Sequence, residues 1–255
     1  MTSNARMRVK ATMVMVRFLA MVLAGLALLC NGVACWAAED FEGLIYPSEV
    51  VKLSSQSPGI IEEITVERGD VVKKGEVLAR LKSGLERVAV ELARANVEFQ
   101  KRKTARNTEL AEKKLISANE KDELETDLKK AELQLEEAQE KLKLRAIAST
   151  IDGVVAERLM APGDYVGEDA ILKLARLDPL KVEVIVPARR YGFIKTGMKA
   201  EVRPEAPVGG VYIGKVTIVD KVVDAASSTY IVRVDFTNHL LKVPSGLRCK
   251  VHFLR

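Results

Sequence analysis

A long charged stretch between Leu85 and Leu144 constrains the fold of this chain more than any other feature. It contains no Gly or Pro, and its polar positions are mostly Glu, Lys, Arg and Gln, which favour helices. Its apolar residues alternate between three and four positions apart, the spacing of a helix that packs along one narrow stripe. In the first part these residues are Leu85, Val88, Leu92, Ala95 and Phe99, and in the second Leu124, Leu128, Ala131, Leu135, Ala138 and Leu142.

The two parts meet at a short break, predicted at Ser117-Ala118-Asn119. A connection this short makes two helices antiparallel neighbours, so the stretch predicts a helical hairpin. At 1.5 Å per residue, a helix from Leu85 to Leu115 would extend roughly 45 Å. That is longer than a compact domain of this size needs, so we expect the hairpin to project towards a distant partner.

The N-terminal residues have the parts of a secretory signal. Basic residues precede an apolar run over residues 18–29, and small residues follow it, which predicts an export signal over residues 1–38. A retained membrane anchor that begins near Met13 is the alternative, although the run is short for a spanning helix, which needs about 20 apolar residues. The four basic residues are Arg6, Arg8, Lys10 and Arg17.

Removal of this segment changes the charge and the cysteine content. The net charge of +5 falls to about +1, so the basic balance indicates membrane insertion and not nucleic-acid binding. Only Cys249 then remains, and one thiol cannot form an intramolecular disulfide. Cys249 alternates with Val251 and Phe253, and we interpret it as a buried strand residue.

An internal repeat flanks the hairpin. Short apolar runs separated by glycines, typical of tight β-turns, extend from Glu39 to Leu81, and the same pattern returns after the helices. Residues 153–155 repeat residues 59–61, and Gly163-Asp164 repeats Gly69-Asp70. A repeat that is interrupted by a hairpin predicts two half-motifs that fold as one unit, with the ends of the hairpin close together.

These paired halves resemble a lipoyl or biotinyl domain. A lipoyl-like domain split by a helical hairpin resembles the periplasmic adaptor, or membrane fusion, family, the HlyD-like proteins that include RND-type efflux adaptor subunits. A cofactor carrier is the competing interpretation, but it needs an attachment lysine on the turn that joins the halves. Here Leu81-Lys82-Ser83 leads directly into the helix, so we expect no lipoyl, biotinyl or other cofactor.

The resemblance implies an α+β fold that is multidomain and elongated. We expect a lipoyl-like, barrel-sandwich hybrid domain in two halves, 39–82 and 148–177, an inserted antiparallel coiled-coil hairpin over 83–147, and a small antiparallel β-barrel over 178–255. Alternation in 180–186 and further short runs predict the barrel strands. The resemblance implies that Tyr191–Thr196 forms the short helix of the family's barrel domain. The family's membrane-proximal domain is expected to be absent or reduced to strands over residues 39–46.

The expected tip of the hairpin carries a second resemblance. Arg106, Leu110 and Ser117 match the family's pattern Arg-x3-Leu-x6-Ser for docking to TolC-like outer-membrane channels. Steps of four and eleven residues place all three side chains within roughly 40° on one strip of a helix. In the alternative interpretation, Arg106 and Leu110 continue the internal stripe from Phe99 and pair across the hairpin.

The sequence offers no catalytic or metal-binding constellation. His239 and His252 are far apart, and Met160 and Met198 are the only methionines after the signal, so we expect no enzyme activity and no metal site. The predicted function is a periplasmic adaptor between an inner-membrane transporter, of RND or ABC type, and a TolC-like channel. We expect a trimeric or hexameric ring. The alternative is an exported solute-binding or scaffold protein that uses the hairpin as an oligomerisation stalk.

Overall fold

The computed structural model describes residues 39–112 and 117–254. The predicted signal, residues 1–38, therefore lies outside the described residues. Within the described ranges, no helix combines the length and the apolar character needed to span a membrane.

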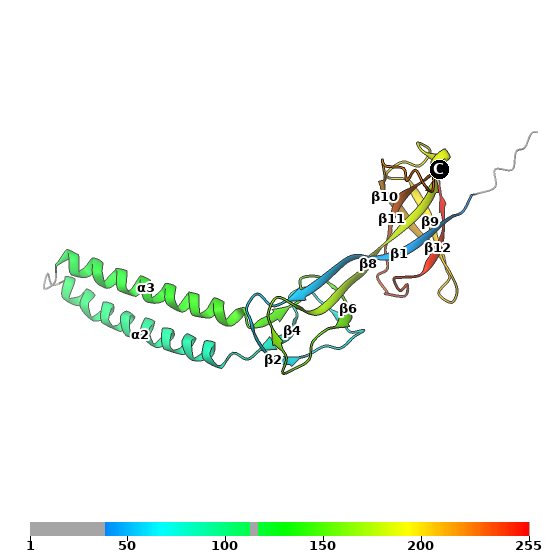
Figure 1. The fold of residues 1–255 in the computed structure, drawn as a ribbon. Coiled ribbons are helices and arrows are strands. Elements are labelled where there is room, and N and C mark those ends of the chain that lie inside the picture. Colours follow the sequence, from blue (N-terminus) through cyan, green and yellow to red (C-terminus); the bar gives the residue numbers. More distant parts are fainter. Residues whose placement is uncertain (1–38, 113–116, 255) are drawn as a thin grey trace, which may run out of the picture. The chain divides into compact units, whose positions relative to one another are not determined.

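Two long antiparallel strands pass through both β-units of the chain. Strand β1 (Phe41–Ser54) pairs with β8 (Ala170–Pro187) from Gly43 opposite Val184 to Ser54 opposite Ala170 (Figure 1). Their pairing continues past the cis Asp178–Pro179 bond, with register shifts between Pro47 and Glu49 and between Leu53 and Ser54. The two β-units therefore share strands and are not joined by a linker.

The first unit is a closed barrel of six strands in the order β1-β12-β9-β10-β11-β8, with β8 pairing back to β1. The prediction of a small antiparallel barrel is confirmed. Its other strands are β9 (Lys199–Pro204), β10 (Tyr212–Val219), β11 (Thr229–Phe236) and β12 (Arg248–Phe253).

The barrel core confirms the predicted alternation of β8. Leu180, Val182, Val184 and Val186 are fully buried, and they pack with Cys249. Burial raises the pKa of the Cys249 thiol to about 12, so the thiol is unreactive at neutral pH.

Two parts of this region differ from the sequence prediction. Residues 41–44, assigned to the lipoyl-like half, pair with barrel strand β12, and Ile45 lies in the barrel core. The prediction of a short helix at Tyr191–Thr196 is wrong. A single 3-10 turn, η2, covers Ala188–Arg190, and Gly192 follows it with a φ of +87°, which an α-helix does not accommodate.

The second unit is the split lipoyl-like domain. Its strands lie in two four-membered groups, β1-β8-β6-β3 and β5-β4-β2-β7, around a core that contains Ile61, Leu78, Val155 and Leu174. The strands not yet given are β2 (Gly59–Ile64), β3 (Val71–Val72), β4 (Val77–Leu81), β5 (Ala146–Ala148), β6 (Gly153–Arg158) and β7 (Tyr165–Val166).

The two halves of the repeat exchange equivalent hydrogen bonds, which confirms that they fold as one unit. Strand β2 of the first half pairs with β7 of the second, and β3 pairs with β6. The repeated Gly-Asp turns bond across in the same way. The N–O pairs are Gly69 N to Val155 O (2.8 Å), Val155 N to Asp70 O (2.9 Å), Gly163 N to Ile61 O (2.9 Å) and Ile61 N to Asp164 O (2.9 Å).

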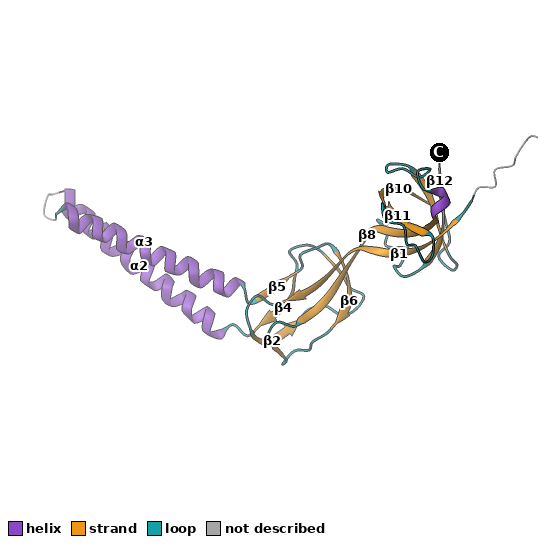
Figure 2. Cartoon of the chain, turned by 45° about the horizontal axis from the view of Figure 1, so that its top comes forward, coloured by secondary structure: helices purple, strands orange, loops and turns teal. Residues whose placement is uncertain are grey.

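The hairpin joins the two halves. Helix α2 (Gly84–Glu112) follows β4, and α3 (Ala118–Lys143) leads into β5 (Figure 2). Ala118 and Asn119, predicted in the break, are helical, and the rest of the connection lies outside the described residues. Ala146 and Ile147, predicted to belong to the hairpin, lie in β5 because they pair with β4.

A glycine at the close approach of β6 to β8 provides a test of the packing in this unit. A Cβ on Gly153 would lie 2.5 Å from the carbonyl oxygen of Ala175, a backbone atom that cannot move aside, whereas a Cβ on Gly167 would contact nothing within 4 Å. Gly153→Ala should therefore lower the free energy of unfolding by about 2 kcal/mol. Gly167→Ala is the matched control, and urea denaturation of both variants should separate them. Equal stabilities of the two variants would contradict the close approach of β6 to β8 at Gly153.

Candidate functional site: the hairpin and its two faces

The base of the hairpin is fixed by one arginine that follows α3. Arg145 donates through Nη1 to the carbonyl oxygen of Pro58 at 2.7 Å and through Nη2 to Glu86 Oε1 at 2.5 Å. The side chains of Arg145 and Glu86 are only 21% and 18% exposed. Because Glu86 lies in the first turn of α2, this bond sets which face of α2 turns towards α3.

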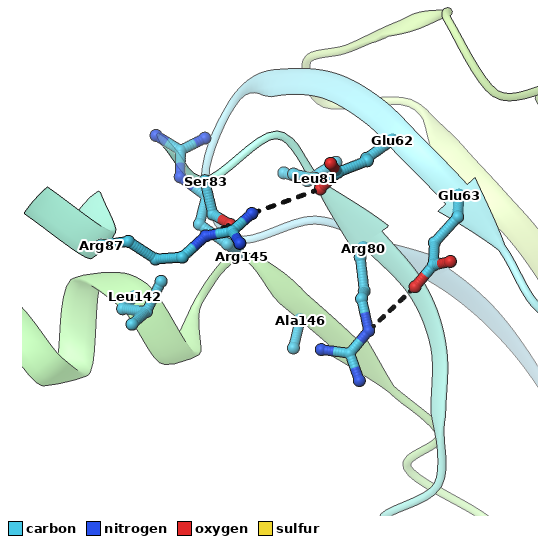
Figure 3. Close-up of a pocket in the computed structure, with 9 residues that line it drawn as sticks. All are labelled: Glu62, Glu63, Arg80, Leu81, Ser83, Arg87, Leu142, Arg145 and Ala146. Atoms are coloured by element: carbon cyan, nitrogen blue, oxygen red, sulfur yellow. Dashed lines mark hydrogen bonds and ion pairs between the residues drawn. The ribbon is translucent and has the colours of Figure 1, made fainter. Parts of the chain in front are cut away.

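A cavity of about 510 Å³ lies at the same junction (Figure 3). Its charged groups are already paired, since Arg80 contacts Glu63 at 3.0 Å and Arg87 contacts Glu62 at 3.8 Å. It is therefore a polar joint between the hairpin and the β-unit. The lining residues are Glu62, Glu63, Arg80, Leu81, Ser83, Arg87, Leu142, Arg145 and Ala146.

The inner stripe of α2 starts from Glu86 and differs from the predicted one. Val90 and Val97 are each 5% exposed and face α3, while the stripe becomes polar towards the tip, at Gln100 and Thr104. The predicted stripe of α3 is confirmed, with Ala131 2% exposed. Its other members, all partly buried, are Leu124, Leu128, Leu135, Ala138 and Leu142.

The stripe predicted to face inward on α2 instead lies on the outside of the hairpin. Leu85 is 85%, Val88 67%, Leu92 73% and Phe99 49% exposed. The prediction for this helix was wrong because two stripes with the same spacing run along α2, and Glu86–Arg145 selects the one with smaller side chains. We call these four residues, together with Ala95, the outer stripe.

A shallow groove of about 590 Å³ adjoins the outer stripe between the two helices. Most of the side chains that line it are alanines, and Leu92 of the outer stripe also lines it. Grooves of this kind accept apolar side chains from a third helix. The lining residues are Ala89, Leu92, Ala93, Ala95, Asn96, Gln134 and Ala138.

Arg106 continues the outer stripe towards the tip, because it follows Phe99 by seven residues, or two helical turns. It is exposed, and it forms no ion pair with any residue whose side chain the structure describes, a set that leaves out residues 109–116. Its exposure shows that it does not belong to the internal stripe. Leu110 also lies in α2, but its side chain is outside the described part of the chain.

Ser117 has a structural role that the sequence analysis missed. It is the N-cap of α3: its Oγ accepts from the amide of Glu120 at 3.2 Å, and its own amide donates to Glu120 Oε2 at 2.8 Å. The bond from the Ser117 amide, and a second one from the Ser117 hydroxyl to the same carboxylate oxygen at 3.0 Å, lower the pKa of Glu120. Ser followed by Glu three residues later is a readable capping-box signal. Ser117 thus lies at the start of α3, and it remains exposed.

No group of three or more His, Cys, Asp or Glu side chains in the described ranges is arranged to hold a metal ion. The arrangement on this hairpin is one of surfaces, with an apolar stripe, a groove and a polar tip. Such surfaces bind helices of other polypeptides.

The split β-unit matches a known domain family. Residues 49–175 match the CzcB-like, barrel-sandwich hybrid domain. An uncharacterized protein of Haemophilus influenzae is 24% identical over 196 residues, which are 76% of this chain and 51% of that protein. The chain spans about half the length of the curated relatives it matches.

Solved structures show the same fold. A MacA–MexA chimera with the α-hairpin of Pseudomonas aeruginosa MexA superposes with a TM-score of 0.71 at 21% identity, over 84% of this chain and 80% of the chimera. The membrane fusion protein Spr0693 of Streptococcus pneumoniae R6 gives 0.65 at 18%, over 85% and 98%. The split β-unit is therefore a barrel-sandwich hybrid domain of the CzcB-like type. Together with the shared fold, this domain matches the membrane fusion, or periplasmic adaptor, family that the sequence resembles.

Truncation of a side chain should affect the stability of the isolated chain on only one of the two faces of α2. Val97→Ala should lower the stability of the hairpin by about 1.5 kcal/mol because it removes buried methyl groups. Leu92→Ala, at an exposed position, should change it by less than about 0.5 kcal/mol. Urea titration followed by helical circular dichroism at low protein concentration measures both. A larger loss of stability for Leu92→Ala than for Val97→Ala would contradict the observed rotation of α2 and favour the inner stripe that was predicted from the sequence.

The cap of α3 should be sensitive to pH. Because the pKa of Glu120 is lowered in the folded chain, its contribution is complete at neutral pH and is lost as the pH falls through that lowered pKa. Ser117→Ala should cost about 1 kcal/mol of hairpin stability, and Ser117→Asp should retain the cap. Backbone NMR of Glu120 during acid titration measures the transition. An unshifted Glu120 would contradict the capping box.

Proposed function

We propose that this protein is a non-enzymatic periplasmic adaptor of a tripartite efflux or secretion system. It is exported by its N-terminal segment and connects an inner-membrane transporter, of RND or ABC type, with a TolC-like outer-membrane channel. The observation that carries the assembly part of the proposal is the outer stripe, and the channel-docking part depends on the tip. A hairpin already closed by an inner stripe has no internal use for a second regular row of apolar side chains, so this row is available for other helices.

The outer stripe supports self-association as one part of the function. Four large side chains, each at least 49% exposed, lie beside a groove lined by alanines, as expected for packing between neighbouring hairpins. Adaptors that assemble side by side into a trimeric or hexameric ring would bury this surface. The ring would then present several hairpin tips together.

The tip supports contact with the channel as the other part. Arg106 can donate a forked set of hydrogen bonds to carbonyl or carboxylate groups. Leu110 would add an apolar contact and Ser117 a small polar one. The exposure of Arg106 favours docking over internal pairing.

A scaffold protein with an oligomerisation stalk is the second candidate. The outer stripe fits this function equally well, since a stalk also needs packing between copies. The two candidates differ only at the tip, where a stalk requires no partner. The test is therefore a crosslink from the tip.

A photoreactive amino acid at position 106 or 117 should capture a TolC-like channel in cells that contain the whole system. Capture of that channel, identified by mass spectrometry, supports the adaptor. Crosslinks between copies of this chain alone would favour the stalk.

Charge reversal tests the role of Arg106. Arg106→Glu should reduce channel capture from position 117 about tenfold or more, because a charge-assisted hydrogen bond contributes about 1.5–3 kcal/mol. Arg94→Glu, an exposed arginine of the same helix paired with Glu91, is the matched control. Equal losses in the two variants would mean that charge on the helix matters but the tip position does not.

A further inference from the structure

The two halves of the repeat carry opposite charges on equivalent turns. Lys74 follows Gly69 by five residues, as Glu168 follows Gly163. The turn of the first half carries Lys73 and Lys74, and the turn of the second half carries Glu168 and Asp169. All four residues are exposed, and none forms an ion pair with a described residue. We name them the basic turn and the acidic turn.

The two turns lie on opposite sides of the lipoyl-like unit. The basic turn joins β3 to β4 and bonds to the loop after β5, where Gly75 N donates to Ser149 O at 2.8 Å. The acidic turn joins β7 to β8, beside Ser54 of β1, which pairs with Ala170. Strands β3 and β1 are the two ends of one group, and β5 and β7 are the two ends of the other.

Each turn adjoins an exposed apolar residue of different size. Val71, 64% exposed, precedes the basic turn, whereas Tyr165, 68% exposed, precedes the acidic turn and pairs with Ile60, 39% exposed. The quasi-equivalent sides therefore differ in shape as well as in charge.

Two carboxylates lie near the basic turn, but both serve the turn itself. Glu76 Oε2 accepts from the amide of Lys73 at 2.8 Å, and Asp152 Oδ1 accepts from the amide of Lys74 at 2.9 Å. Neither forms an ion pair with the two ammonium groups. The lysine side chains remain available for acidic groups on another molecule.

We propose that lipoyl-like units of neighbouring copies pack head to tail, with Lys73 and Lys74 of one copy against Glu168 and Asp169 of the next. The inference rests on the proposed homo-oligomer and assigns its polarity. The occupant is a second copy because one chain presents both charges on opposite sides. A two-fold symmetric contact would place like charges together, whereas a head-to-tail contact repeats around a ring.

Cysteine crosslinking distinguishes the two geometries. The background is the full chain with Cys30→Ser and Cys35→Ser, which keeps Cys249 because it is buried and unreactive. A chain with both Lys74→Cys and Glu168→Cys, treated with a short bis-maleimide, should give a ladder of dimers, trimers and higher species. Each cysteine alone should give no ladder, and a mixture of the two single variants should stop at the dimer.

Charge swapping tests the chemistry of the same contact. Lys73→Glu with Lys74→Glu should weaken self-association about tenfold or more in sedimentation, and so should Glu168→Lys with Asp169→Lys. The chain with all four substitutions should recover the self-association of the unchanged chain. Lys199→Glu with Lys250→Glu, on the exposed barrel surface, is the matched control and should have little effect.

The outcomes separate this inference from the proposed function. Efficient dimers from Lys74→Cys alone, or assembly in sedimentation without a ladder, would overturn the head-to-tail contact and leave the homo-oligomer standing. Absence of any assembly would overturn both the contact and the ring. Capture of the channel from the hairpin tip is measured independently and does not depend on these variants.

Discussion

The structure depends on backbone hydrogen bonds exchanged between two halves of one repeat. Each half supplies strands to both groups of the lipoyl-like unit, so neither half can complete a sheet alone. This constraint also explains how a long insertion is tolerated. The hairpin joins β4 to β5, which pair antiparallel with Arg80 opposite Ala146, so the chain leaves and returns on neighbouring strands. Two antiparallel helices are the simplest insertion for such an exit.

Shared strands also join the two β-units. Strands β1 and β8 serve both the barrel and the split unit, and the chain therefore has no linker between them. The barrel was predicted to begin at residue 178, but Asp178-Pro179 lies within strand β8 in the structure. Proline is tolerated there because Pro179 lies at the register shift between the pairs Pro47–Leu180 and Glu49–Arg176, where residues 177–179 have no partner on β1. A strand that continues through two cores leaves no turn signal, so sequence alone could not place this boundary.

Sequence patterns predicted an element correctly where the pattern fits only one structural arrangement. The repeat, the hairpin, the α3 stripe and the barrel strands were predicted because their spacing allows no equivalent alternative. The rotation of α2 could not be predicted, since two stripes share one spacing and hydrophobicity favours the wrong one. A contact between Glu86 and Arg145, 59 residues apart in sequence, decides it. The role of Ser117 as a cap was readable from Glu120 but was masked by its match to a docking pattern.

The rotation of α2 links the stability of the hairpin to its environment. The inner stripe uses small or polar side chains, so two helices alone bury little apolar surface, and isolated helices of this kind are marginal. In the outer stripe, the side chains of Leu85, Val88, Leu92 and Phe99 remain exposed. Full burial of each contributes about 1.5–3 kcal/mol, so contact with further helices can stabilise the hairpin more than its own fold does. A helix pair organised in this way is best ordered when other helices cover it, as its proposed place between a transporter and a channel requires.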